Sequence, residues 1–125
     1  MISANPYDVL SAIFCFYPKD RFKNDREKIH SSLYKIRSQQ NFFELLKDFI
    51  FRKNLNFPRS RVLDEVLSSL QPEFLGKINP AYDVYTIKKD SLHKLWESDL
   101  KTSLESKEPE IKEIAEELHK LLGDA

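Results

Sequence analysis

The sequence predicts a mainly α-helical domain with one small β-hairpin. Ser60 is a good helix N-cap, and the apolar residues that follow it have helical spacing until Pro72 ends the helix. Two short β-prone runs come next, at residues 75–78 and 84–87, with turn-forming residues at 79–83 between them. A helix that leads directly into a small hairpin is how a winged helix-turn-helix domain ends, so we expect that fold.

Size and composition suit one globular domain. The chain has 125 residues, of which 41% are hydrophobic and 32% are charged, with 2 glycines and 6 prolines. A single cysteine, Cys15, excludes an internal disulfide and a cysteine-based zinc site, and its apolar surroundings indicate core packing. No signal peptide and no apolar run long enough for a membrane span are visible, so we expect a cytoplasmic protein.

Three helical patterns precede Ser60. The first begins at Asn5-Pro6 and runs to about Tyr17, and a basic loop at residues 19–24 follows it, anchored by Phe22. Asn24 or Asp25 caps the second helix. The apolar positions of the second and third helices are Ile29, Leu33, Ile36, Phe42, Leu45, Leu46, Phe49 and Ile50. The end of the third pattern is open, because residues 49–51 would also suit the start of a strand.

Two more helices are expected after the hairpin. Asp90 is the expected cap of the first, whose leucines and Trp96 have helical spacing. Pro109 restarts the pattern, and Gly123 ends the final helix. We therefore divide the chain into a winged-helix domain, residues 1–105, and an amphipathic C-terminal helix, residues 106–125. This helix belongs to the same domain or forms a dimerisation arm.

The apolar stripe of the final helix is the candidate interface. It includes Ile111, Ile114, Leu118 and Leu121, with an acidic polar face opposite. One interpretation is that the stripe packs on the protein's own core. The other is a contact with a groove on a partner, or a homodimer seam between two copies.

Charge is distributed unevenly along the chain. The total is zero, with 20 Lys and Arg against 20 Asp and Glu. Residues 1–90 carry 15 basic and 11 acidic side chains, whereas residues 91–125 carry 5 and 9. Between residues 19 and 61 the counts are 12 and 5, a net of +7. This asymmetry suits a basic binding face with an acidic tail, although charged solvated helix faces give a similar pattern.

The sequence contains no recognisable catalytic, cofactor-binding or metal-binding motif. His30, His93 and His119 lie on different expected helices and have no ligand-spaced partners, so we expect surface or edge histidines. With glycine only at positions 76 and 123, a glycine-rich phosphate loop cannot form. No Gly-x-Ser-x-Gly elbow is present. We therefore expect no enzyme, no cofactor and no small-molecule substrate.

Binding remains as the expected function. In a winged helix the start of the recognition helix faces the major groove and the wing meets the backbone. Asp64 and Glu65 in the same turns would repel phosphate. The candidate contacts with duplex DNA are Arg59 and Arg61 at the helix start and Lys77, Lys88 and Lys89 beside the hairpin.

Residues 24–90 resemble the Panacea-type antitoxin domain and its bacterial winged-helix relatives. The resemblance is carried by a basic helix at residues 27–36, EKIHSSLYKI, by the turn Phe57-Pro58-Arg59-Ser60, and by a helix with regular leucines. Phe57 and Arg59 stand where the family has glycine and tyrosine. The resemblance implies a winged-helix fold, a non-enzymatic role and the option of a protein partner such as a toxin.

The first functional hypothesis is therefore a regulatory nucleic-acid-binding protein that acts as a dimer. The second is a protein-interaction module of the antitoxin or adaptor type. An enzyme without a recognisable motif ranks third.

Overall fold

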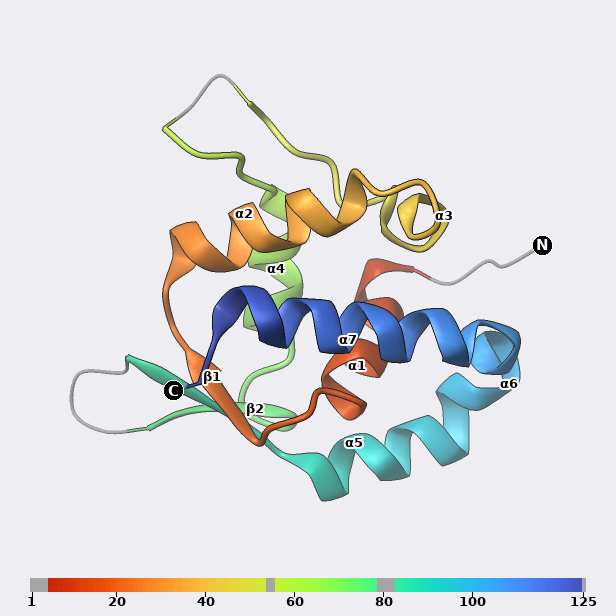
Figure 1. Ribbon diagram of the computed structural model, residues 1–125. Coiled ribbons are helices and arrows are strands. Elements are labelled where there is room, and N and C mark those ends of the chain that lie inside the picture. The colour runs from red at the N-terminus through yellow and green to blue at the C-terminus, as the bar shows by residue number, and fades with distance from the viewer. Residues whose placement is uncertain (1–4, 54–55, 79–82, 125) are drawn as a thin grey trace.

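The computed structural model describes residues 5–53, 56–78 and 83–124 (Figure 1). The chain is mainly helical, with a small three-stranded antiparallel sheet at one edge. The turn expected at residues 79–83 lies outside the described residues except for Asp83.

The first two helices begin where the sequence predicts. α1, Pro6–Cys15, is capped by Asn5, whose side chain accepts the amide N–H of Asp8 at 2.8 Å. α2, Arg26–Arg37, is capped in the same way by Asp25, which accepts from the amide of Lys28 at 3.1 Å. α1 ends at Cys15, before the expected Tyr17.

The basic loop expected between α1 and α2 contains a short strand, β1, Arg21–Lys23. β1 pairs antiparallel with β3, Val84–Ile87, so the expected hairpin is part of a three-stranded sheet. Phe22 anchors the strand as predicted, since it is fully buried. Its ring stacks between those of Phe14 and Tyr85, with 5.0 Å between the ring centres in both pairs.

The third predicted helix is shorter than expected. α3 covers Phe43–Leu46, and residues 49–51 do not begin a strand. The guanidinium of Arg37 donates to the carbonyls of Leu46 and Lys47 at 3.2 and 3.1 Å, which satisfies backbone oxygens at the end of this single turn.

Beyond α3 the chain forms a protruding arm. The backbones of Arg52 and Arg59 exchange two hydrogen bonds, of 2.8 and 3.1 Å, as in an antiparallel ladder. We call residues 52, 53 and 56–59 the basic arm. It stands out from the body of the molecule above α2 and α4 (Figure 1).

α4, Arg61–Ser69, confirms the helix predicted after Ser60, and the antiparallel pairing predicted for residues 75–78 and 84–87 is confirmed as well. The hydroxyl of Ser60 accepts the amide N–H of Leu63 at 3.1 Å and so caps the helix. β2, Leu75–Ile78, then pairs antiparallel with β3, giving the sheet order β1-β3-β2. We call the β2–β3 pair the ribbon.

The C-terminal part differs in one detail from the prediction. α5 begins at Lys89, so Asp90 is not its cap but lies in its first turn, where the helix dipole favours a carboxylate. α5 ends at Leu95, and the chain stays helical through a π-helical segment, Trp96–Leu100, and through α6, Lys101–Leu104.

The final helix begins after one 3₁₀ turn, Glu105–Lys107. α7 covers Glu108–Leu122 and contains Pro109 in its first turn. Gly123 follows with φ of 75°, a backbone conformation that glycine adopts without strain, and this confirms the predicted stop.

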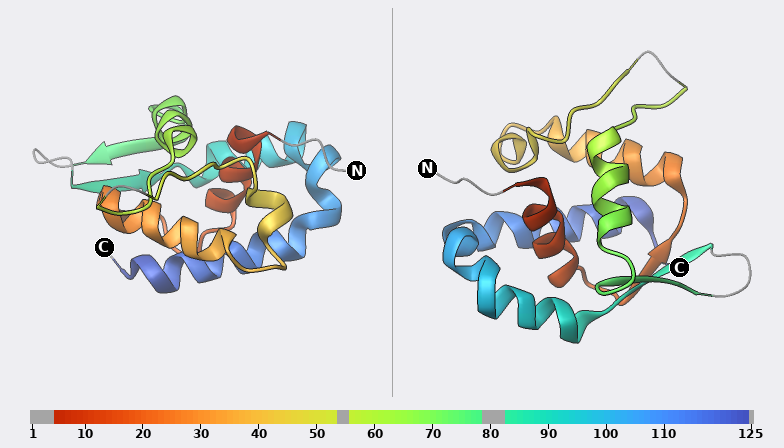
Figure 2. Two further views of the ribbon diagram at one scale, coloured as in Figure 1. Left: turned by 90° about the horizontal axis from the view of Figure 1, so that it is seen from above. Right: turned by 180° about the vertical axis from the view of Figure 1, so that it is seen from behind.

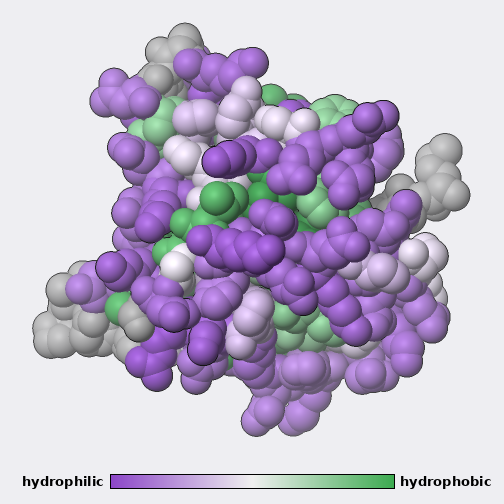
Figure 3. Space-filling model, viewed as in Figure 1, coloured by the Kyte–Doolittle hydropathy of each residue, from purple (hydrophilic) through white to green (hydrophobic). Residues whose placement is uncertain are grey.

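The apolar stripe of α7 packs inside its own chain. Ile111 and Ile114 are fully buried, and Leu118 is 3% exposed. α7 lies against α1 and α2 (Figure 1), and hydrophobic side chains are visible between α2 and α7 on a mostly hydrophilic face (Figure 3). The burial of these three residues agrees with the first interpretation of the stripe, packing on the protein's own core. Leu121 is half-buried.

The helices of the described residues include none with the length and apolar character that crossing a bilayer requires.

The burial of α7 predicts a large effect of truncating its stripe. Ile114→Ala should lower the free energy of unfolding by about 2–5 kcal/mol, because it leaves a cavity between α7 and the body of the protein. Urea denaturation measures the change. Glu113→Ala, at a neighbouring exposed position, is the matched control and should change little. Equal stability of the two variants would contradict this packing.

Candidate functional site

Lys89 serves the fold and is not free to contact DNA. Its ammonium donates to the carbonyls of Phe14 at 3.0 Å, of Cys15 at 3.2 Å and of Tyr17. These oxygens lie at the C-terminal end of α1, where a cation is favoured by the helix dipole. Burial lowers the pKa of Lys89. The structure therefore does not favour the predicted contact of Lys89 with DNA, because its donors already satisfy backbone acceptors.

Two more of the predicted contacts are held within the chain. The ammonium of Lys88 donates to the carbonyl of Pro72. The guanidinium of Arg59 lies over the ring of Phe57, 4.9 Å from its centre, and its Nε atom is buried without a hydrogen-bond partner among the described residues. Both side chains would have to leave these contacts to reach a ligand.

Arg61 and Lys77 remain exposed. The Arg61 side chain is 91% exposed and forms an ion pair of 3.0 Å with Glu65, one turn further along α4. Lys77 projects from β2 with its ammonium 5.6 Å from the centre of the Tyr85 ring. Of the five residues predicted to contact DNA, Lys88 is exposed as well, but these two are the exposed ones whose charged groups do not bind a backbone carbonyl among the described residues.

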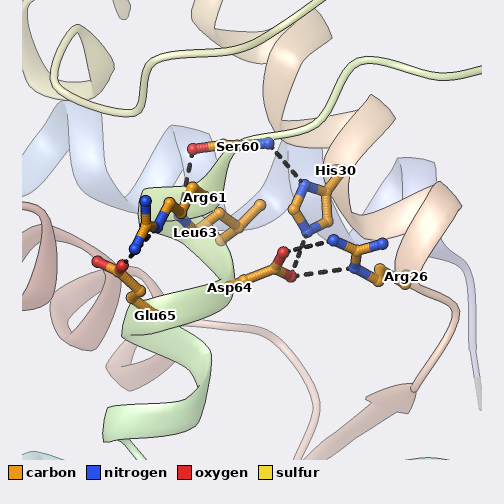
Figure 4. Close-up of polar contacts among 7 residues, drawn as sticks. All are labelled: Arg26, His30, Ser60, Arg61, Leu63, Asp64 and Glu65. Carbon is orange, nitrogen blue, oxygen red and sulfur yellow. Dashed lines mark hydrogen bonds and ion pairs between the residues drawn. The ribbon is translucent and has the colours of Figure 1, made fainter. Parts of the chain in front are cut away.

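His30 is the residue that the sequence interpretation misplaced. It was expected at the surface, yet its side chain is fully buried between α2 and the start of α4 (Figure 4). Nδ1 of His30 accepts the backbone N–H of Ser60 at 3.0 Å. Nε2 lies 2.9 Å from a carboxylate oxygen of Asp64.

These partners fix the protonation state of His30. The backbone N–H of Ser60 can only donate, so Nδ1 must carry no proton. Nε2 then holds the hydrogen and donates it to Asp64, which gives a neutral imidazole with both nitrogens satisfied. A second proton would place two N–H groups against each other at Ser60. Burial lowers the pKa of His30 against the opposing effect of Asp64, which agrees with the neutral form.

Asp64 is also held by Arg26. The guanidinium donates through Nε at 3.2 Å and through Nη2 at 2.5 Å, one bond to each carboxylate oxygen. Burial raises the pKa of Asp64, but the hydrogen bonds from Arg26 and His30 outweigh it and keep the pKa below its ordinary value. The carboxylate is therefore charged and paired.

The same residues do not form a nucleophile and base. The Ser60 hydroxyl accepts from the amide of Leu63, and His30 binds the backbone of Ser60 and not its side chain. Cys15 lies 3.9 Å from His93, but the thiol is buried and burial raises its pKa, so little thiolate forms. Within residues 5–53, 56–78 and 83–124 no group of His, Cys, Asp and Glu has a metal-binding arrangement.

An open groove of about 510 Å³ lies beside the paired Asp64. Its walls come from the start of α2, from the side of α4 that faces α2, and from the ribbon. The lining residues are Asn24, Arg26, Ile29, His30, Asp64, Leu67, Ser68, Gln71, Lys77 and Tyr85.

Comparisons of the chain with models of protein families, with curated proteins and with solved structures found no match. The function of the chain is therefore inferred from its own geometry.

The environment of His30 predicts that acid weakens the fold. The unfolded chain binds the proton at a pKa near 6.5, whereas burial lowers the pKa in the folded protein. The contribution of His30 to the free energy of unfolding should therefore be complete above pH 6.5. It should be lost as the pH falls through the folded-state pKa. Urea denaturation between about pH 7.5 and about pH 5, followed by Trp96 fluorescence, measures this slope.

His30→Gln should flatten that slope, because an amide does not titrate in this range. His93→Gln, the same substitution at an exposed position of α5, is the matched control and should affect the slope less than His30→Gln does. An unchanged slope in His30→Gln would show that other groups cause the acid sensitivity.

The contacts of Lys89 predict a structural role. Lys89→Met should lower the free energy of unfolding by roughly 1–3 kcal/mol, because it removes the charged hydrogen bonds to the end of α1. Lys94→Met, at an exposed position of α5, serves as the control and should have little effect. Chemical denaturation of both variants tests the assignment, and equal stabilities would refute it.

Proposed function

We propose that the chain is a winged helix-turn-helix protein that binds nucleic acid in a non-enzymatic, regulatory role. The order of elements supports this fold: α1, β1, α2, then α4 followed directly by the ribbon, with sheet order β1-β3-β2. In a winged helix, α4 would be the recognition helix and the ribbon the wing.

One feature departs from the simplest form of that fold. The two helices of a helix-turn-helix are joined by a turn of about 3–4 residues. Here residues 38–60 separate α2 from α4, and they contain α3 and the basic arm. The long connection places the arm at the start of α4, so it adds a positively charged element beside the proposed recognition helix.

The observation that carries the proposal is the placement of α4 between two protruding elements. Seen from behind, α4 lies on the surface with the arm beyond its N-terminal end and the ribbon near its C-terminal end (Figure 2, right). Residues 49–63 contain four Lys or Arg and no Asp or Glu. Arg52 and Lys53 are exposed on the arm. Such a surface suits a phosphate backbone that runs along α4.

The two carboxylates of α4 are both paired with arginines. Asp64 is held by Arg26 and Glu65 by Arg61, so each negative charge is offset locally. The repulsion expected between α4 and phosphate is thereby reduced. The revised contact set is Arg52, Lys53, Arg61 and Lys77.

A protein partner is the second candidate function. It is favoured by the engagement of Lys88, Lys89 and Arg59 within the chain, which removes charge from the proposed DNA face. The resemblance to antitoxin domains agrees with this alternative.

The nucleic-acid proposal predicts salt-dependent binding to random duplex DNA. Dissociation constants of about 10⁻⁴–10⁻⁶ M are typical of non-specific binding at physiological salt, and lower salt should strengthen it. Replacing Arg52 and Lys53 together by Ala should weaken binding to all sequences. It should also reduce the slope of log affinity against log salt by about one for each phosphate that is no longer neutralised. Fluorescence anisotropy at several salt concentrations measures both.

The matched control is a Lys94→Ala and Lys120→Ala double variant, which removes two exposed charges from α5 and α7. It should bind like the original protein. Arg61→Ala should cost about 1–3 kcal/mol on a preferred site if Arg61 reads a base. Absence of binding at tens of micromolar protein in low salt would reject the proposal and favour the protein partner.

A further inference from the structure

We propose that the groove between α2, α4 and the ribbon is a binding site for a phosphate group. The phosphate can belong to a nucleic-acid backbone, in which case the inference rests on the function proposed above. It can also belong to a phosphorylated small molecule. Both sources present the same chemistry to the groove.

Hydrogen-bond donors reach the groove from three different elements. Arg26 comes from α2, Ser68 from α4 and Lys77 from β2, and all three residues are exposed. On β3 the hydroxyl oxygen of Tyr85 accepts from the side-chain amide of Gln71 at 3.4 Å, so its own hydrogen remains available. Donors from several directions suit the tetrahedral oxygens of a phosphate better than the two oxygens of a planar carboxylate.

Asp64 orients the guanidinium of Arg26 for binding to a phosphate. The carboxylate engages Nε and Nη2 and so holds the guanidinium plane in one orientation. The second terminal nitrogen, Nη1, has no acceptor among the residues that the structure describes. A guanidinium fixed in this way loses less side-chain entropy when it binds an anion than a free arginine does.

The charge of the groove also favours an anion. Asp64 is the one acidic side chain of its lining, and both of its oxygens accept hydrogen bonds from Arg26 or His30. His30 is neutral. Arg26 and Lys77 therefore leave a net charge of +1 on the lining, with the negative charge turned toward its own partners.

The position of the groove connects it with the proposed DNA face. Its α4 lining runs from Asp64, near the start of the helix, to Gln71 beyond its end, and it continues to Lys77 and Tyr85 of the ribbon. A duplex that follows α4 from the arm would bring its backbone past this groove. The arm and the groove would then bind successive phosphates along α4.

An NMR titration of the full chain with inorganic phosphate tests the site. Backbone amide signals of Ser68, Gln71 and Lys77 should shift saturably with phosphate and not with chloride at equal ionic strength. Lys77→Gln should weaken phosphate binding by about tenfold through loss of a positive charge, and Ser68→Val by about tenfold through loss of one hydrogen bond to a charged group. Both positions are exposed, so the variants should fold, and a thermal melt checks this.

Lys28→Gln is the matched control, because Lys28 is exposed on α2 beside Arg26 but does not line the groove. It should bind phosphate as the original protein does. Equal behaviour of Lys77→Gln and Lys28→Gln, or shifts that chloride reproduces, would overturn the proposal.

Addition of duplex DNA separates this inference from the proposed function. Displacement of phosphate by DNA would support both and identify the backbone as the source. Saturable phosphate binding without DNA binding would support the groove, assign it to a phosphorylated small molecule and reject the nucleic-acid function. DNA binding without a phosphate effect specific to the groove would keep the function and reject the site. Absence of both would reject both.

Discussion

The imidazole of His30 on α2 links that helix to α4 through a hydrogen bond with Ser60, which lies thirty residues later in the chain. One ring nitrogen satisfies the backbone N–H of Ser60, and the other binds Asp64 in the first turns of α4. Ser60 is itself fully buried and caps that helix. Because an unpaired buried polar group costs about 1–3 kcal/mol, these bonds restrict how α4 can lie against α2. The same bonds therefore also fix the position of the exposed face of α4 and of the base of the arm.

Lys89 plays a corresponding part between α1 and α5. A lysine beside a hairpin has the charge expected of a wing, yet here the ammonium binds three carbonyls at and just beyond the end of α1. Its positive charge therefore stabilises the body of the protein. The net charge of a segment does not show which of its Lys and Arg side chains are free to bind a ligand. A backbone carbonyl far away in the sequence can already accept their hydrogen bonds.

The sequence correctly predicted the features that depend on interactions between neighbouring residues. The caps at Asn5, Asp25 and Ser60 and the antiparallel ribbon each depend on residues close together in sequence. The errors concern distant contacts. Phe22 becomes part of a strand because β3, more than sixty residues later, offers it a partner, and His30 is buried because of Ser60 and Asp64. No spacing in one sequence reveals such pairs, so the groove could not be predicted either.

Arg26 links the stability of the fold to the chemistry of the groove. Its bonds to Asp64 compensate a carboxylate that burial penalises, and they also fix the guanidinium that faces the groove. Loss of Asp64 would loosen α4 and free Arg26 together, so its effect on binding could not be separated from its effect on folding. Lys77 and Ser68 have no such second role, because both are exposed and neither holds a helix in place. An anion in the groove would give Arg26 a second partner beside Asp64 and draw α2, α4 and the ribbon together. Binding there should therefore stabilise the same junction that His30 maintains from inside.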